Sequence, residues 1–253
     1  MRRFVLGALV PAIILVLWET LGQAGVLSED GFSRPSLILQ AGAKVLADGM
    51  LLKQTGETFA SAILGLAIAT VLGIASGTLL GLYRWMERVT VLVVEALRPV
   101  PSVALIPVAL LIFGFGQVMS ASVVAFACFW PILIVTVSAV RSIDPRVIEV
   151  SRVMGFPLHA RILKFALPAA LPGILVGVRV AAGIAIVVAV TVEIAANPRG
   201  LGYGMIVAQQ SLNAPIMWAT LLWLGIVGFL ANWGLERLER RCLRWYWIAR
   251  SGA

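Results

Sequence analysis

Long apolar runs, separated by short polar segments, follow one another along this chain. A helix needs roughly 17–25 mostly apolar residues to cross a bilayer, so each run of that length predicts one membrane-spanning helix. Six such runs put both ends of the chain on the same side of the membrane. The predicted spans are about residues 5–21, 58–82, 89–113, 118–140, 168–194 and 216–235.

The first run has an alternative interpretation. Arg2 and Arg3 precede it, as basic residues precede the apolar region of a secretory signal peptide. The run is long for that region, and the following sequence "WETLGQAG" has no clear small-x-small cleavage site. A retained helix is therefore the favoured prediction.

Composition supports a membrane protein. The 253 residues are 60% hydrophobic and 13% charged, with a mean hydropathy of +0.99, whereas soluble domains are roughly 25% charged. We therefore expect an all-α membrane protein with one transmembrane domain over residues 1–253. Cys128 and Cys242 lack the spacing of a metal site.

The net charge of +8 does not require a nucleic-acid partner. Most lysines and arginines fall in the segments that face the cytoplasm if the N-terminus lies there. Such a bias follows the positive-inside rule. Both termini, and the polar segment 141–167, are therefore expected in the cytoplasm.

One outer segment, residues 26–54, is too polar to span a membrane. A helix is predicted to begin near Ser33 and Pro35, and its apolar residues recur at helical spacing. We expect a short amphipathic helix on the outer surface. Its apolar residues are Leu37, Ile38, Ala41, Val45 and Leu46.

The segment 141–167 carries paired helix signals between two spans. Asp144 and Pro145 form a good helix start, and Gly155 is expected to end that helix after about Met154. Pro157 can then start a second short helix. Two short helices exposed in the cytoplasm suit docking into a groove of another protein. The alternative is a loop that is only solvated.

The sequence "EVSRVMGFPLHARILKFALP" resembles the cytoplasmic loop of ABC-importer permease subunits. That signature is Glu-Ala-Ala, three residues, Gly, nine residues and Ile-x-Leu-Pro. The spacing is kept here, and the departures are Val150, Ser151 and Phe165. The resemblance implies a coupling helix that inserts into an ATPase subunit. The implied coupling residues are Glu149, Val150, Ser151, Gly155, Leu167 and Pro168.

The stretches "RPVPSVALIPVALLIFGFG" and "EIAANPRGLGYGMIVAQQ" resemble the nitrate/sulfonate/taurine branch of these permeases. The resemblance implies a type I importer transmembrane domain in a bacterial inner membrane, working as a homodimer. Its partners would be an ATP-binding subunit that holds ATP-Mg and a soluble substrate-binding protein. The implied substrate is a sulfonate, taurine, nitrate or similar small anion. The branch also includes importers of vitamin precursors and aromatic acids.

No cofactor or catalytic role is expected for this chain. It contains no G-x-x-x-x-G-K-[ST] run that could hold ATP phosphates. Its single histidine, His159, lies in the basic loop, so catalysis of the Ser-His-Asp type is not expected. A stand-alone secondary transporter is an alternative, but the inverted repeats and deep ion site of that class are not visible.

Two ionisable residues lie in the fifth predicted span. Arg179 and Glu193 fall within about 40° of one helix face and roughly 21 Å apart along it. Because charges inside a membrane usually face protein or water, this face, with Ile186, is a candidate translocation path. The alternative is that each residue pairs structurally with another helix or a lipid head group. Glu95 and Arg98, three residues apart, are expected to form a structural pair.

Small residues recur at every fourth position in the second and fifth spans. Such ridges let helix backbones approach closely in lipid. We expect packing within one subunit, and the alternative is packing between subunits. The two ridges are Gly65, Ala69, Gly73, Gly77 and Gly81, and Gly173, Gly177, Ala181, Ala185 and Ala189.

Overall fold

The computed structural model describes residues 2–26 and 31–242, and every regular element in this range is a helix. The longer helices are α1 (Arg2–Gln23), α2 (Pro35–Ala47), α3 (Met50–Leu82), α4 (Arg84–Leu97), α6 (Gln117–Arg141), α9 (Leu167–Ala195), α10 (Leu201–Gln210) and α11 (Ala214–Cys242). The shorter ones are η1 (Ser102–Leu105), α5 (Ile106–Phe113), α7 (Pro145–Val153), α8 (Leu158–Arg161) and η2 (Ile162–Ala166).

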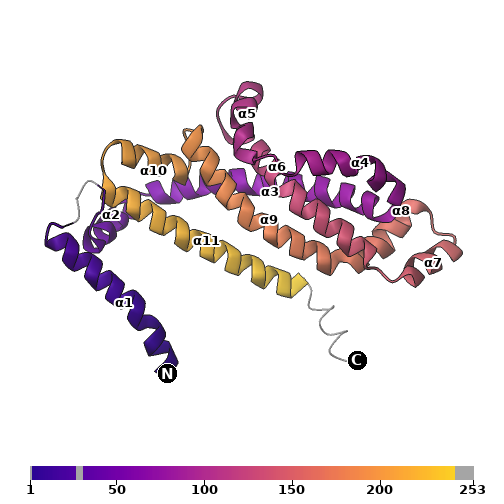
Figure 1. Ribbon diagram of the computed structural model, residues 1–253, viewed down its shortest axis with the longest axis horizontal. Coiled ribbons are helices and arrows are strands. Elements are labelled where there is room, and N and C mark those ends of the chain that lie inside the picture. Colours follow the sequence, from indigo (N-terminus) through magenta and orange to yellow (C-terminus); the bar gives the residue numbers. More distant parts are fainter. Residues whose placement is uncertain (1, 27–30, 243–253) are drawn as a thin grey trace.

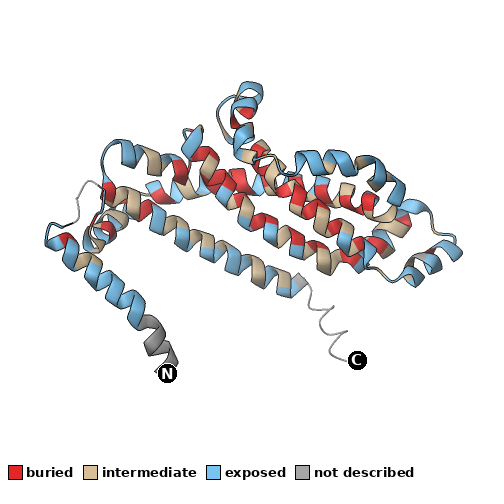
Figure 2. Cartoon of the chain, viewed as in Figure 1, coloured by how far each residue is buried: buried red, intermediate tan, exposed pale blue. Residues whose placement is uncertain are grey.

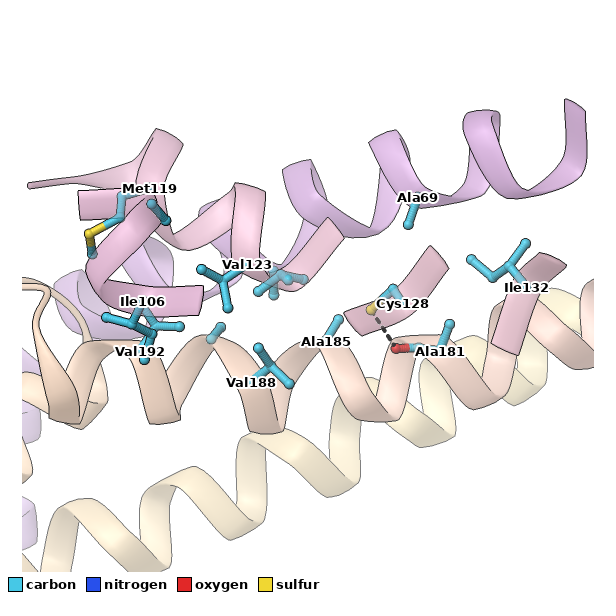
Figure 3. Packing of buried hydrophobic residues seen from close by; sticks show 14 residues of the cluster. Ala69, Ile106, Met119, Val123, Cys128, Ile132, Ala181, Ala185, Val188 and Val192 are labelled. Carbon is cyan, nitrogen blue, oxygen red and sulfur yellow. Dashed lines mark hydrogen bonds between the residues drawn. The ribbon is translucent and has the colours of Figure 1, made fainter. Parts of the chain in front are cut away.

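The core lies between α3, α6 and α9, which run side by side along the length of the molecule (Figure 1). Buried residues concentrate on these three helices (Figure 2). Their contact is formed mainly by alanines and β-branched residues, as Figure 3 shows for Ala181, Ala185, Val188 and Val192 of α9. The Cys128 thiol donates a hydrogen bond to the Ala181 carbonyl at 3.3 Å. Small side chains therefore set the close spacing of the core helices.

The glycine ridge of α3 packs against α6. A Cβ added to Gly65 would lie 2.6 Å from Val124 Cβ, and one added to Gly77 would lie 2.6 Å from Thr136 Cβ. On α9, the corresponding Cβ of Gly177 would lie 2.9 Å from Val135 Cβ. The expectation that these ridges pack within one subunit is confirmed.

Four helices are long and apolar enough to cross a membrane: α3, α6, the continuous helical stretch Leu158–Ala195 and Ala214–Arg241 of α11. They contain the predicted spans 58–82, 118–140, 168–194 and 216–235. In α1, the described apolar segment is Leu9–Gln23, which is shorter than the four spans. The described residues thus give four spans, or five if the bent pair Arg84–Leu97 and Ser102–Phe113 counts as one span. The predicted number of six spans stays a prediction.

The predicted span 89–113 is not one straight helix. It is divided into α4 and the segment Ser102–Phe113, which meet at 85°. Arg98, Pro99, Val100 and Pro101 occupy the break. Proline has no backbone N–H and clashes with the preceding helical turn, so two prolines one residue apart end α4 here.

Helices α1 and α2 lie at the end of the molecule opposite α7, where α2 packs against α11 and α3 (Figure 1). Figure 1 shows α1 projecting away from the bundle. Its contacts with the rest of the described chain are near its C-terminal end. There the Trp18 and Trp218 rings lie 5.4 Å apart, and the Ser36 N–H donates to the Glu19 carboxylate at 3.0 Å. The predicted amphipathic helix is α2, which buries Ile38 and Val45.

Candidate coupling loop and translocation residues

The coupling loop, residues 141–167, lies at one end of the molecule, far from α2 and α10 (Figure 1). Its first helix, α7, begins as predicted. Pro145 occupies the first turn, and the Asp144 carboxylate accepts a hydrogen bond from the Arg146 N–H at 2.9 Å. Gly155 follows the helix with a φ of +73°, a conformation that favours glycine. The local sequence therefore determines where α7 starts and stops.

The second helix of the loop does not form a separate element. After Pro157, α8 covers only Leu158–Arg161 and continues through the π-helical turn η2 into α9. The Phe156 and Phe165 rings lie 5.1 Å apart and join the turn after α7 to η2. The loop is thus joined directly to a core helix through η2.

The predicted coupling residues do not share one environment. Ser151 is buried, and Leu167 is half-buried. Glu149, Val150, Gly155 and Pro168 are exposed. The sequence pattern therefore combines residues that shape the loop with residues that a partner can contact.

An exposed apolar surface accompanies them. Val153 and Met154 are 87% and 65% exposed, and Val150 is 52% exposed. The charged side chains of Glu149 and Arg152 are exposed on the same helix. A short helix with apolar side chains beside charges is suited to helix-in-groove recognition.

Arg179 lies on α9 and faces the C-terminal half of α11. Its guanidinium is 3.3 Å from the Glu239 carboxylate and 3.8 Å from that of Glu236. Arg240 also pairs with Glu236, at 2.6 Å. These four side chains line a cavity of about 430 Å³. The contacts match the alternative that Arg179 pairs structurally with another helix.

Glu193 lies near the opposite end of α9 and is 2% exposed. Its carboxylate accepts hydrogen bonds from the Thr58 hydroxyl at 2.9 Å and from the Gly202 N–H at 3.0 Å. The Thr58 oxygen in turn accepts the Leu201 N–H at 3.0 Å. Glu193 therefore joins α9 to α3 and to the start of α10.

The turn between α9 and α10 needs glycine. Gly200 has a φ of +91°, and a Cβ at this position would overlap the Glu193 carboxylate. Its N–H donates to the Glu57 carboxylate at 2.9 Å. The Asn197 amide nitrogen donates to the Ser120 hydroxyl of α6 at 2.8 Å. Side chains from α3, α6 and α9 thus hold this turn in place.

Arg179 and Glu193 share a helix but not a site, since each has its own partners at an opposite end of α9. Ile186, between them, is half-buried. Their role in a translocation path stays a prediction. The partners Glu239 and Thr58 were missed from the sequence because they lie 60 and 135 residues away, a separation at which no local pattern operates.

The predicted ion pair between Glu95 and Arg98 is wrong. Both side chains are exposed, and no ion pair or hydrogen bond joins them in the described part of the chain. Arg98 caps α4 with helical dihedrals and still donates its N–H to the Val94 carbonyl, so the i,i+3 spacing is kept and the two exposed side chains do not use it.

Comparison with known proteins gives a family match. Residues 69–244, which include the coupling loop and α9, match the family described as the binding-protein-dependent transport system inner membrane component. One similar protein is SsuC of Bacillus subtilis (strain 168), named for aliphatic sulfonates transport. It is 33% identical over 239 residues, covering 94% of this chain and 87% of that protein.

A second relative is RibX of Chloroflexus aurantiacus, named as a riboflavin transport system permease protein. It is 32% identical over 249 residues, covering 97% of this chain and 93% of that protein. Among solved structures, an inward-facing MetNI methionine ABC transporter superposes with a TM-score of 0.66 and 23% identity, covering 76% of this chain and 95% of that chain. At this identity the likeness concerns the fold alone.

Proposed function

Because the chain belongs to the family of binding-protein-dependent transport system inner membrane components, we propose that it forms the membrane pathway for a small sulfonate-type anion. As a member of that family, it is a permease subunit of an ABC importer and not an enzyme. The proposal adds the substrate, the partners' docking sites and the orientation in the membrane.

One observation carries the coupling part of the proposal. The chain has no P-loop, yet it presents a capped helix with exposed apolar residues at one end of the bundle. ATP-Mg would therefore be held by a separate ATP-binding subunit, which docks on α7. Glu149 and Val150 would contact it, while Ser151, Gly155, Leu167 and Pro168 would shape the loop that carries them.

The other partners follow from the family. A soluble binding protein would deliver the substrate at the outer end, where α2 and α10 lie. A second copy of the chain would complete the pathway, and the apolar surface of α1, which projects from the bundle, is available to pack on it or on lipid. Both termini would be cytoplasmic, as the distribution of lysine and arginine predicts.

A sulfonate is proposed because the named function of SsuC agrees with the resemblance of two stretches to the sulfonate branch. The second candidate is a vitamin-type substrate, which the named function of RibX favours. Selectivity in these systems would depend largely on the binding protein, so the substrate must be identified with that partner present.

The first test is purification of the tagged chain from its native membrane in mild detergent, with mass spectrometry of the copurifying chains. We expect an ATPase subunit and a soluble binding protein, and then ATP-dependent uptake of an alkanesulfonate by the reconstituted complex. Uptake of riboflavin instead would select the second candidate. A chain recovered alone even after crosslinking would contradict the proposed docking.

The candidate path residues need their own test. Arg179→Ala should lower uptake if Arg179 lines the path, while Glu239→Ala separates that effect from loss of the ion pair. Ile186 and Glu193 are tested in the same way, by substitution with alanine and measurement of uptake. Normal assembly with unchanged uptake in Arg179→Ala would remove Arg179 from the path.

A further inference from the structure

A cavity of about 330 Å³ lies at the break that follows α4, where η1 meets α6 and α9. Aromatic and aliphatic side chains form most of its wall, and one guanidinium lies beside them. The lining includes Arg98, Ser102, Phe126, Trp130, Ile134 and Ile184.

The cavity lies near the middle of the spans. Trp130 is roughly 20 Å from the start of α6 and roughly 16 Å from its end, at about 1.5 Å per residue. Arg98 follows the 14 residues of α4, which cover roughly 21 Å. A broken helix at membrane depth is tolerated where it is buried in protein or lines a water-filled cavity. The 85° bend borders the cavity, in accord with this rule.

Two polar groups at this cavity lack partners. Arg98 is an exposed residue at the wall of the cavity, and its side chain makes no ion pair or side-chain hydrogen bond within the described residues. Trp130 is 9% exposed, and its indole N–H has no acceptor there. An exposed guanidinium without a counter-charge is free to bind an anion, and a buried donor such as the Trp130 N–H is costly without an acceptor. Both groups would be satisfied by an anion that enters the cavity.

The cavity beside Arg179 does not have this property. There Glu236 and Glu239 already neutralise Arg179 and Arg240. A second anion in that cavity would meet two carboxylates. Of these two cavities, the one at the α4 break therefore offers the uncompensated positive charge.

We propose that this cavity is a subsite for the oxyanion head group of the transported molecule, on the premise of the proposed function. The Arg98 guanidinium would bind two sulfonate oxygens through its planar fork of N–H donors. The Ser102 hydroxyl and the Trp130 N–H supply further donors. Phe126, Ile134 and Ile184 form an apolar wall for a short alkyl chain.

The subsite can be tested by equilibrium binding of radiolabelled hexanesulfonate to the permease–ATPase complex in lipid nanodiscs. The binding protein is left out, so its selectivity does not enter the result. Arg98→Ala should weaken binding by at least about tenfold, since charge-assisted hydrogen bonds are lost. Trp130→Phe, which keeps an aromatic ring, should weaken binding roughly three- to tenfold.

Matched controls exist on α4. Arg88→Ala removes an exposed arginine, and Trp85→Phe changes a tryptophan that is 62% exposed. Both should bind hexanesulfonate like the wild type. If Arg98→Ala does not assemble, Arg98→Lys replaces it, because it keeps the charge and loses the fork. Arg98→Lys should bind more weakly than the wild type.

The subsite would be overturned if Arg98→Ala or Trp130→Phe bound hexanesulfonate with wild-type affinity. If Arg98→Ala does not assemble, wild-type affinity of Arg98→Lys would overturn it in the same way. So would a wild-type complex that binds riboflavin here and no sulfonate. ATP- and binding-protein-dependent uptake by the wild-type complex, measured in proteoliposomes, tests the proposed function separately. Uptake of hexanesulfonate without any binding at this cavity would leave the importer standing and reject the subsite.

Discussion

At the scale of single residues, the buried polar groups near the C-terminal end of α9 hold neighbouring segments together. The Glu193 carboxylate is surrounded by protein and accepts from Thr58 and from the backbone of Gly202. A buried polar group is tolerated when its hydrogen bonds are made. Glu193 therefore stabilises the α9–α10 turn through contacts that a sequence pattern does not show.

Replacing Glu193 should reveal that stabilisation. Glu193→Ala leaves the Gly202 N–H and the Thr58 hydroxyl without their acceptor, so the free energy of unfolding should fall by about 1–3 kcal/mol. Glu193→Gln keeps an acceptor oxygen and should lose less. Thermal unfolding of the detergent-solubilised chain measures both, and equal melting temperatures for Glu193→Ala and wild type would contradict the assignment.

At the scale of elements, close packing of α3 on α6 depends on glycine at particular positions. Gly77 faces α6 at a distance that leaves no room for a Cβ, whereas Gly56 on the same helix has no neighbour within 4 Å. The same residue type therefore has opposite consequences at two positions of α3.

Alanine substitution should change the free energy of unfolding in different directions at these two positions. Gly77→Ala overpacks the contact with Thr136 and should lower the free energy of unfolding by about 1–3 kcal/mol. Gly56→Ala should be neutral or stabilising by up to ~1 kcal/mol, since alanine favours a helix over glycine. Thermal unfolding in one detergent compares them, and destabilisation of both by the same amount would reject the packing argument.

The coupling loop is a second element with a direct test. Gly155→Val forces a β-branched residue into a positive φ and should displace α7, and Glu149→Arg reverses an exposed charge. Each should lower substrate-stimulated ATP hydrolysis by the reconstituted complex roughly tenfold, a change of ~1.4 kcal/mol. The measurement is phosphate release in proteoliposomes.

Gly25→Val is the matched control for that experiment. Gly25 also has a positive φ, 71°, and open space around it, but it follows α1 and lies far from the loop. It should keep coupling near the wild-type value. Full stimulation in both Gly155→Val and Glu149→Arg, with normal membrane insertion, would count against docking at α7.

At the scale of the whole molecule, the fold is that of a type I ABC importer transmembrane domain, so the predicted fold class is confirmed. The core helices connect the coupling loop at one end with the turn at Glu193 at the other (Figure 1). In that arrangement α9 is continuous with the loop and also holds the outer turn. We therefore expect a displacement of the coupling loop to be passed along α9 toward the turn at Glu193.

This arrangement predicts opposite accessibility of the two ends. In a chain with Cys128 and Cys242 replaced by alanine, Ser142→Cys should react with a membrane-impermeant maleimide only after the cytoplasmic side is opened. Gln210→Cys should react in intact spheroplasts, because Gln210 ends α10 at the end of the molecule that the lysine and arginine distribution predicts to face outward. Labelling of Ser142→Cys in intact spheroplasts would reverse the orientation taken from the lysine and arginine distribution.

The sequence by itself determined what depends on neighbours along the chain. Run length predicted the spans that became α3, α6, α9 and α11, because a bilayer requires a minimum apolar length. The Asp144 cap and Gly155 predicted the bounds of α7, because helix ends are governed by local hydrogen bonds and local φ.

Only the tertiary structure decided the contacts between distant segments. It showed the 85° break in the predicted span 89–113, the ion pairs of Arg179 with α11 and the burial of Glu193 against Thr58. It also brought Arg98 and Trp130 to one cavity. These features depend on which helix faces cross in space, and residues 60 or 135 positions apart have no local rule that pairs them.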